Sequence, residues 1–195
     1  MIDIPEPRLL SNPEFVALLL ECFEYGDGSL FWKERPVSHF KSKRGHSVFS
    51  KLFAGQKVGY LYKNRRGRES YLHAEVFGKG FMVHRVIFAL HNGFIDGFLD
   101  IDHIDGNGLN NKIENLRAVR QEENKKNLPL SKANKTGVIG VTWCNRQKQY
   151  TATIKKNGKH KFLGYFDDIN AAAAARKKAE IDLGYHENHG RLRNV

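Results

Sequence analysis

The side chains with the clearest capacity for chemistry stand in the middle of the chain, at Asp102, His103, Asn115 and Asn124. Asn115 follows His103 by twelve residues, and Asn124 follows Asn115 by nine. Histidine, with a reference pKa of about 6.5, is a suitable general base at neutral pH, and we assign His103 that role. The oxygens of Asp102 and Asn124 suit one hard divalent cation, Mg²⁺ or alternatively Mn²⁺. Asn115 is expected to hold the loop and through it to orient the His103 ring.

These residue types fit the hydrolysis of a phosphodiester bond. That reaction needs a deprotonated water, neutralisation of the negative transition state and stabilisation of the leaving 3′ oxygen. One cation and a histidine base fit this set of ligands better than a two-metal site, which would need more carboxylates. An Asp-His pair at a strand end is common by itself, so the prediction depends on its spacing to the two asparagines.

A strand, a loop, a second strand and a helix must position these residues. The sequence predicts a strand at 100–104, a turn-forming loop at 106–111, a strand at 116–119 and a short helix at 121–128 that stops at Pro129. Folding back of these elements would bring the end of the first strand next to the first turns of the helix. Asp102 and Asn124 would then present two oxygens towards one point.

The rest of the pattern predicts an α+β protein. Upstream we expect a helix at 14–23, a strand at 29–33, an irregular basic loop at 34–54, strands at 58–62 and 70–75, and a buried helix at 83–90. Downstream we expect strands at 138–143, 149–156 and 160–166, with a hairpin turn at Asn157-Gly158, and a helix at 169–183. The predicted organisation is an N-terminal region 1–50, a catalytic domain 51–128 with its core at 100–128, a linker 129–136, a small domain 137–184 and a tail 185–195.

Charge is distributed unevenly along the chain, whose formal net charge is +11. Residues 33–68 carry eleven Lys and Arg against one acid, and residues 125–195 carry fifteen against five. Residues 69–124 between them carry five against nine. Basic blocks of this kind attract phosphate backbones through counterion release, and a hydrolytic metal site needs the acids between them. Generic solubility is the alternative explanation for the charge alone.

Several classes of protein are excluded by what the sequence lacks. It has no apolar run of the length that a membrane span needs, no signal-peptide pattern at its start and only two cysteines, Cys22 and Cys144. We therefore expect a cytoplasmic protein without a membrane partner or a small-molecule cofactor. No dimer seam is visible, so a monomer or a weak dimer is expected.

The segment IDHIDGNGLNNKIENLRAVRQEENKKN, residues 101–127, resembles the HNH homing-type endonucleases of phages, in the variant whose third motif residue is Asn. The stretch ahead of it, residues 59–93, is similar to the Y-x-V-H-R lead-in of that family. The resemblance implies a ββα-metal core in which His103 is the base, Asn115 is the middle motif residue, and Asp102 and Asn124 bind the metal. Asp105 stands where the family often has Asn or Lys, which removes no catalytic group.

Residues 137–180 resemble the ethylene-response-factor (Apetala-like) type of plant DNA-binding domain. The resemblance implies a three-stranded antiparallel sheet, backed by one helix, that lies in the major groove of DNA. Alternation along the strands selects the expected DNA contacts, which are Thr142, Arg146, Lys148, Tyr150, Lys155 and Lys161. On the helix at 83–90, Arg85 is a further candidate for a phosphate contact, whereas His84 is expected to be a structural core residue.

The most concrete hypothesis is a metal-dependent DNA endonuclease acting on double-stranded DNA, of the homing or free-standing phage type. The alternative is a DNA-binding regulatory protein with an inactive core. A third possibility, a basic RNA-binding protein, is disfavoured by the ordered acids at one site. The sequence leaves open the target site and whether one strand or both are cut.

Overall fold

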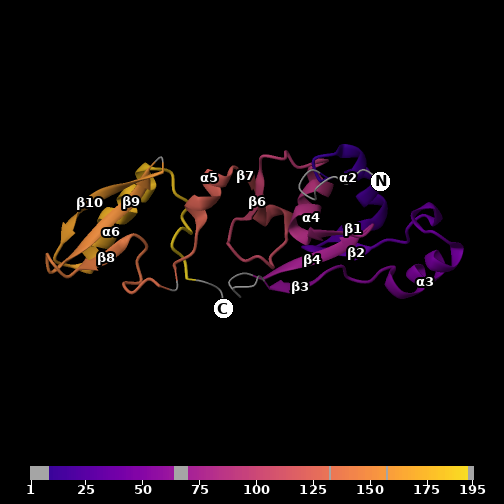
Figure 1. The fold of residues 1–195 in the computed structure, drawn as a ribbon, viewed down its shortest axis with the longest axis horizontal. Coiled ribbons are helices and arrows are strands. Elements are labelled where there is room, and N and C mark those ends of the chain that lie inside the picture. The colour runs from indigo at the N-terminus through magenta and orange to yellow at the C-terminus, as the bar shows by residue number, and fades with distance from the viewer. Residues whose placement is uncertain (1–8, 64–69, 132, 157, 193–195) are drawn as a thin grey trace. The chain divides into compact units, whose positions relative to one another are not determined.

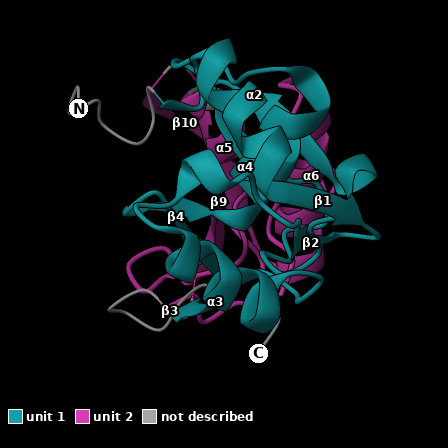
Figure 2. Cartoon of the chain, turned by 90° about the vertical axis from the view of Figure 1, so that its right-hand side faces the viewer, with its two compact units in different colours: residues 1–120 teal, residues 121–195 magenta. Residues whose placement is uncertain are grey.

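A computed structural model of the protein describes residues 9–63, 70–131, 133–156 and 158–192. The chain divides into two compact units, residues 1–120 and residues 121–195 (Figure 2). Both combine helices with small antiparallel sheets, so the predicted mixture of helix and sheet is confirmed. The predicted domain boundaries and the metal-binding details of the core stay predictions.

Unit 1 contains a two-stranded hairpin, a three-stranded sheet in the order β3-β4-β5, and a second two-stranded ladder, β6-β7 (Figure 1). Its elements in chain order are α2 (Pro13–Cys22), β1 (Phe23–Gly26), β2 (Ser29–Trp32), η1 (Val37–His39), α3 (Lys43–Phe53), β3 (Tyr60–Lys63), β4 (Ser70–Val76), β5 (Lys79–Met82), α4 (Val83–Asn92), β6 (Asp100–His103), η2 (Ile113–Asn115) and β7 (Leu116–Val119).

Local sequence signals account for where these elements begin and turn. The Asn12 side chain caps α2 by accepting a hydrogen bond from the Glu14 backbone at 2.8 Å. Pro13 is the first residue of α2, where a backbone N–H would have no partner within the helix, so its absence from proline costs nothing. The turn between β1 and β2 has positive φ at Asp27 (41°) and Gly28 (77°), the conformation that tight hairpin turns need.

The core of unit 1 forms around α4. This helix buries Val83, Val86 and Ile87, and the same apolar cluster includes Ile101 of β6 and Leu116 of β7. The β6-β7 ladder is therefore held against α4 by shared apolar packing. Burial of each such side chain contributes about 1.5–3 kcal/mol, which helps to fix β6, the strand that carries Asp102 and His103.

The prediction of an irregular loop at 34–54 is wrong for its second half, where α3 forms. Ser42 caps the helix, accepting from the Gly45 backbone at 3.1 Å. Phe49 packs against Trp32 and Phe40, with ring centroids 5.3 Å from each. The composition of the segment is basic and rich in serine, which is typical of loops. The helix is decided by this cap and by the packing of Phe49.

Unit 2 contains a three-stranded antiparallel sheet, in the order β10-β9-β8, with α6 packed against it. This arrangement was predicted for residues 137–184. Its elements are α5 (Gln121–Asn124), η3 (Lys125–Asn127), β8 (Val141–Cys144), β9 (Gln149–Lys156), β10 (Lys159–Phe166) and α6 (Ile169–Asp182). No helix of the described residues is long and apolar enough to cross a membrane.

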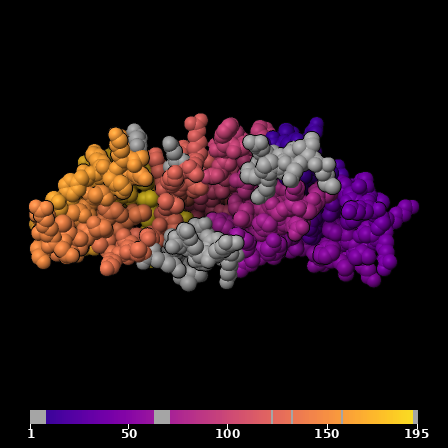
Figure 3. Space-filling view, in the orientation of Figure 1, coloured from indigo at the N-terminus to yellow at the C-terminus, as the bar shows by residue number. Residues whose placement is uncertain are grey.

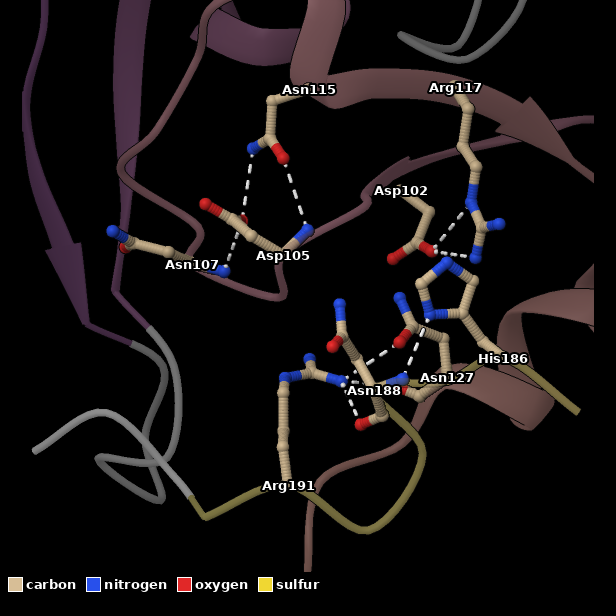
Figure 4. A network of polar contacts seen from close by, with 9 residues as sticks. All are labelled: Asp102, Asp105, Asn107, Asn115, Arg117, Asn127, His186, Asn188 and Arg191. Atoms are coloured by element: carbon tan, nitrogen blue, oxygen red, sulfur yellow. Dashed lines mark hydrogen bonds and ion pairs between the residues drawn. The ribbon is translucent and has the colours of Figure 1, made fainter.

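The segment expected to be a tail contacts the end of the predicted catalytic domain and the expected linker, all within unit 2. Arg191 donates to the Asn127 side chain at 2.9 Å, and the Gly190 backbone donates to the Leu128 carbonyl at 2.8 Å. In the expected linker, the Leu130 backbone donates to the Arg191 carbonyl at 2.8 Å. Figure 4 shows Arg191 directed at Asn127. Backbone pairing of this kind makes the segment around Leu128 part of the unit.

Candidate functional site

The predicted base, His103, is the last residue of β6 and is only 4% exposed. In the antiparallel ladder with β7, His103 lies opposite Leu116 and Asp102 lies opposite Arg117. Successive side chains of a strand point to opposite faces, so His103 shares the buried face with Ile101, while Asp102 faces the other way. The two adjacent residues are thus placed in different surroundings.

Asn111 is the partner of His103 that the sequence did not reveal. Its Oδ1 lies 2.9 Å from Nε2 of His103, and the residue is 1% exposed. An amide oxygen can only accept, so Nε2 carries the proton and donates it to Asn111. Nδ1 is then the basic nitrogen of the ring. The only sequence signal was a second Asn in a loop that looked like an ordinary turn.

A second histidine packs against His103. The His84 ring, on α4, lies 4.8 Å from the His103 ring at 61°, and the Tyr71 ring lies 5.5 Å from His84 and 6.1 Å from His103. His84 Nδ1 is buried and has no hydrogen-bond partner among the described residues. The prediction that His84 is a core residue agrees with its burial, but it also borders the candidate site.

Burial sets the protonation of both histidines. It lowers the pKa of His84 to about 3, with further lowering by the nearby His103 and Arg85. Burial also lowers the pKa of His103, against the opposing effects of the Asn111 hydrogen bond and the charges of Asp105 and Asp102. His103 is consequently neutral at neutral pH and able to accept a proton.

Asn115 fastens the loop between β6 and β7. Its Oδ1 accepts from the Asp105 backbone at 3.0 Å, and its Nδ2 donates to Asp105 Oδ1 at 3.0 Å (Figure 4). Nδ2 also donates to the Asn110 carbonyl at 2.8 Å. Asn110 is the neighbour of Asn111, so this bonding reaches the residue next to the partner of His103. The predicted orienting role of Asn115 stays a prediction.

The Asp105 carboxylate is also part of this loop. It accepts from the Asn107 backbone at 2.8 Å and from the Asn110 side chain at 2.7 Å, besides Asn115. Partial burial alone would raise the pKa of Asp105, but these hydrogen bonds to the charged form hold it below its ordinary value. Asp105 therefore serves as an acceptor that closes the loop.

Asp102 has a guanidinium partner that was not predicted. Its Oδ2 accepts from Nη2 of Arg117 at 2.9 Å and from Nε at 3.3 Å, as Figure 4 shows. The other predicted metal ligand, Asn124, ends α5 in unit 2. Among the described residues, no group of three or more His, Cys, Asp and Glu side chains is placed to hold a metal. Mg²⁺ is commonly held by one or two protein oxygens and keeps several waters, so a carboxylate with an amide oxygen still suits it chemically.

The predicted DNA contacts of unit 2 fall on two sides of its sheet. Thr142 and Lys155 lie on the face away from α6, while Tyr150 packs against the apolar cluster beneath the sheet. Phe162 and Tyr165, 52% and 46% exposed, are aromatic residues that the sequence analysis did not select. Arg146, Lys148 and Lys161 are exposed, and Arg85 is half-buried on α4. The DNA-binding role of all these residues stays a prediction.

Comparison with known proteins gives matches centred on the same region. A family model described as HNH endonuclease matches residues 81–126. Protein 3.8 of Escherichia phage T7 is 36% identical over 80 residues, which are 40% of this chain and 66% of that protein. An uncharacterized HNH endonuclease of Acanthamoeba polyphaga mimivirus is 36% identical over 98 residues, which are 50% of this chain and 49% of that protein. The chain thus spans 66% and 49% of these two relatives.

One solved structure was also matched, that of the HNH homing endonuclease I-HmuI, described as showing DNA binding and cleavage by that protein. Its identity to this chain is 21% and the TM-score is 0.32, with 89% of this chain and 92% of that one covered.

Proposed function

We propose that the protein is a metal-dependent endonuclease that hydrolyses phosphodiester bonds of double-stranded DNA, and the match of residues 81–126 to an HNH endonuclease family model supports this proposal. One observation carries this proposal furthest. The buried, neutral His103 is held in a single tautomer by Asn111 at 2.9 Å, and Asp102, the preceding residue of β6, directs its carboxylate to the opposite face of the ladder. A base and an anionic ligand at consecutive positions of one strand end are the two kinds of group that metal-assisted hydrolysis requires.

In the proposed reaction His103 removes a proton from the attacking water through Nδ1, while Nε2 stays bonded to Asn111. Asn115 and Asp105 keep the loop closed, so the ring does not turn away. Arg117 lies 2.9 Å from Asp102 and is the described cation nearest to that carboxylate in the ladder. It limits the repulsion between the carboxylate and an approaching phosphate.

Asp102 and Asn124 would hold the divalent cation. Bound there, the cation supplies neutralisation of the phosphoryl charge and stabilisation of the leaving oxygen. Mg²⁺ is proposed because the predicted ligands are hard oxygens, and Mn²⁺ is the alternative.

DNA is the proposed substrate because of the two basic blocks, at 33–68 and 125–195. We further propose that unit 2 is the ethylene-response-factor-type module, whose outer sheet face contacts the duplex. Exposed lysines there would meet phosphates, and Phe162 and Tyr165 offer apolar surface for base edges or sugars.

The test is incubation of supercoiled plasmid with the purified protein and Mg²⁺, Mn²⁺ or a chelator. We expect nicked or linear DNA with metal only, and loss of this activity in His103→Ala. The matched control is His91→Ala, which removes an exposed histidine of α4 in the same unit. Intact plasmid under all metals and with varied target DNA would contradict the proposal and favour a DNA-binding regulatory protein with an inactive core.

A further inference from the structure

Helix α3 is fastened to unit 1 from one side only. The Phe49 ring contacts Trp32 and Phe40, and the Arg35 guanidinium lies over the Phe49 ring, 5.1 Å from the ring centroid. No residue of α3 is buried. The side of α3 opposite Phe49 therefore does not take part in the packing that holds the helix.

The opposite side of α3 is basic. Arg44, Ser47 and Lys51 recur at helical spacing on the side away from Phe49, and all three are exposed, as is Lys43. We call these four residues the α3 basic face. The sequence contains no Asp or Glu between Glu34 and Glu69, so no carboxylate of this segment offsets its charge. In Figure 1, α3 lies at the edge of unit 1, with β2 between it and β6. Figure 3 shows the same edge in a space-filling view.

We propose that the α3 basic face binds the phosphate backbone of duplex DNA to one side of the bond that is cut. The inference rests on the proposed function, and it adds a second contact surface, within the unit that carries His103. Exposed lysine and arginine with a serine hydroxyl on one face are the donors that contact phosphates. The helix would thereby lengthen the DNA footprint on that side.

An anionic lipid surface is the competing partner for a basic amphipathic helix. Val48, Leu52 and Phe53 are indeed exposed, at 49%, 58% and 46%. However, the Phe49 side chain packs against Trp32 and Phe40 of unit 1 and is not available for insertion into lipid. A helix of 11 residues with its main aromatic anchor occupied offers little area for insertion into lipid. Charge complementarity to the polyanion that the same unit is proposed to cut therefore favours DNA.

The experiment measures how the affinity for a labelled mixed-sequence duplex depends on salt. The full-length triple variant Lys43→Gln/Arg44→Gln/Lys51→Gln is compared with wild type by fluorescence anisotropy, in the presence of a chelator so that no DNA is cut. Each lost phosphate contact reduces the slope of log K against log salt by about 0.9, so we expect a slope shallower by about 2.7 and weaker binding at every salt concentration.

Two controls separate charge from folding. The charge-conserving triple Lys43→Arg/Arg44→Lys/Lys51→Arg should keep the wild-type slope. Lys112→Gln should also keep it, because the Lys112 ammonium is already paired with Asp27 at 2.9 Å. Circular dichroism of each variant should match that of wild type, since every changed side chain is exposed.

A wild-type slope in the glutamine triple would overturn the inference about α3, and cleavage of plasmid by the wild-type protein would still leave the proposed nuclease function standing. A shallower slope in the glutamine triple, together with intact plasmid after incubation with the wild-type protein, would support the DNA-binding face and refute the nuclease. Binding to phosphatidylserine vesicles that the glutamine triple abolishes, with an unchanged duplex slope, would assign the face to a membrane and refute our inference.

Discussion

Replacement of Asn111 by leucine is expected to damage activity much more than stability. The substitution leaves Nε2–H of the buried His103 without its acceptor, which costs about 1–3 kcal/mol. It also removes Nδ2 of Asn111, a buried donor with no partner among the described residues, and relief of that penalty offsets much of the loss. The net change in the free energy of unfolding should therefore stay within about 2 kcal/mol.

The effect on catalysis has no such compensation. Without the hydrogen bond, the His103 ring is free to rotate and to exchange tautomers. Loss of a partner that orients a site residue typically costs about 10–100-fold in activity. Asn111→Asp provides the control, because a carboxylate still accepts from Nε2–H. We expect its kcat to lie closer to wild type than that of Asn111→Leu, even though burial of the new charge lowers stability.

The assay is steady-state nicking of supercoiled plasmid, with kcat and KM separated, alongside urea unfolding of each variant. Nitrogen-15 NMR of the histidine side chains should show His103 protonated at Nε2 in the wild type and a mixture of tautomers in Asn111→Leu. A leucine variant that retains the wild-type kcat, or an aspartate variant as inactive as the leucine one, would refute the positioning role of Asn111.

Three further predictions concern ionisable groups. Burial lowers the pKa of His84 to about 3 in the folded chain, so between about pH 6.5 and pH 3 only the unfolded state binds a proton at this residue. The contribution of His84 to the free energy of unfolding should therefore fall by about 1.4 kcal/mol per pH unit on acidification through this range. Urea titrations should show a smaller loss of stability in His84→Phe. Arg117→Gln removes a cation 2.9 Å from Asp102, so the Mg²⁺ concentration for half-maximal cleavage should fall several-fold in a metal titration. Arg176→Met should destabilise unit 2 by about 3 kcal/mol in urea unfolding, because the buried Glu180 loses its partner at 2.9 Å and keeps the longer ion pair with the exposed Lys177 at 3.8 Å.

The regular elements were largely predictable because their local signals agree with their packing. The strand at 116–119 has the bounds of β7, and the helix at 14–23 differs from α2 by one residue at each end. In unit 2 the strand predicted at 149–156 has the bounds of β9, and β9 pairs with β10 in antiparallel fashion as expected, while Asn157 of the predicted turn lies outside the described residues. Alternation and turn chemistry operate over a few residues, so a single sequence contains them.

The contacts of the candidate site could not be predicted in the same way. The packing of His84 against His103 joins α4 to β6. It depends on how the helix lies on the β6-β7 ladder, which the local sequence of neither α4 nor β6 specifies. Asn111 was treated as a turn residue because asparagine is common in turns, and only the closed loop directs its side chain to His103. The Arg117 partner of Asp102 follows from the register of β6 and β7, which the sequence alone did not specify.

The charges of unit 1 suggest that binding and chemistry are carried by different surfaces. Asp100, Asp102 and Asp105 stand within six residues of one another, so the candidate site by itself repels a phosphate backbone. At an effective dielectric constant of about 20, one such pair of charges 4 Å apart costs about 4 kcal/mol. Arg117 and one divalent cation compensate this locally, but they add little affinity beyond it. Under the proposed function, most of the binding energy for DNA comes from the basic segments outside the site, which include the α3 basic face. Variants of those segments should therefore raise KM with little change in kcat, whereas variants of His103 and Asn111 should lower kcat with little change in KM.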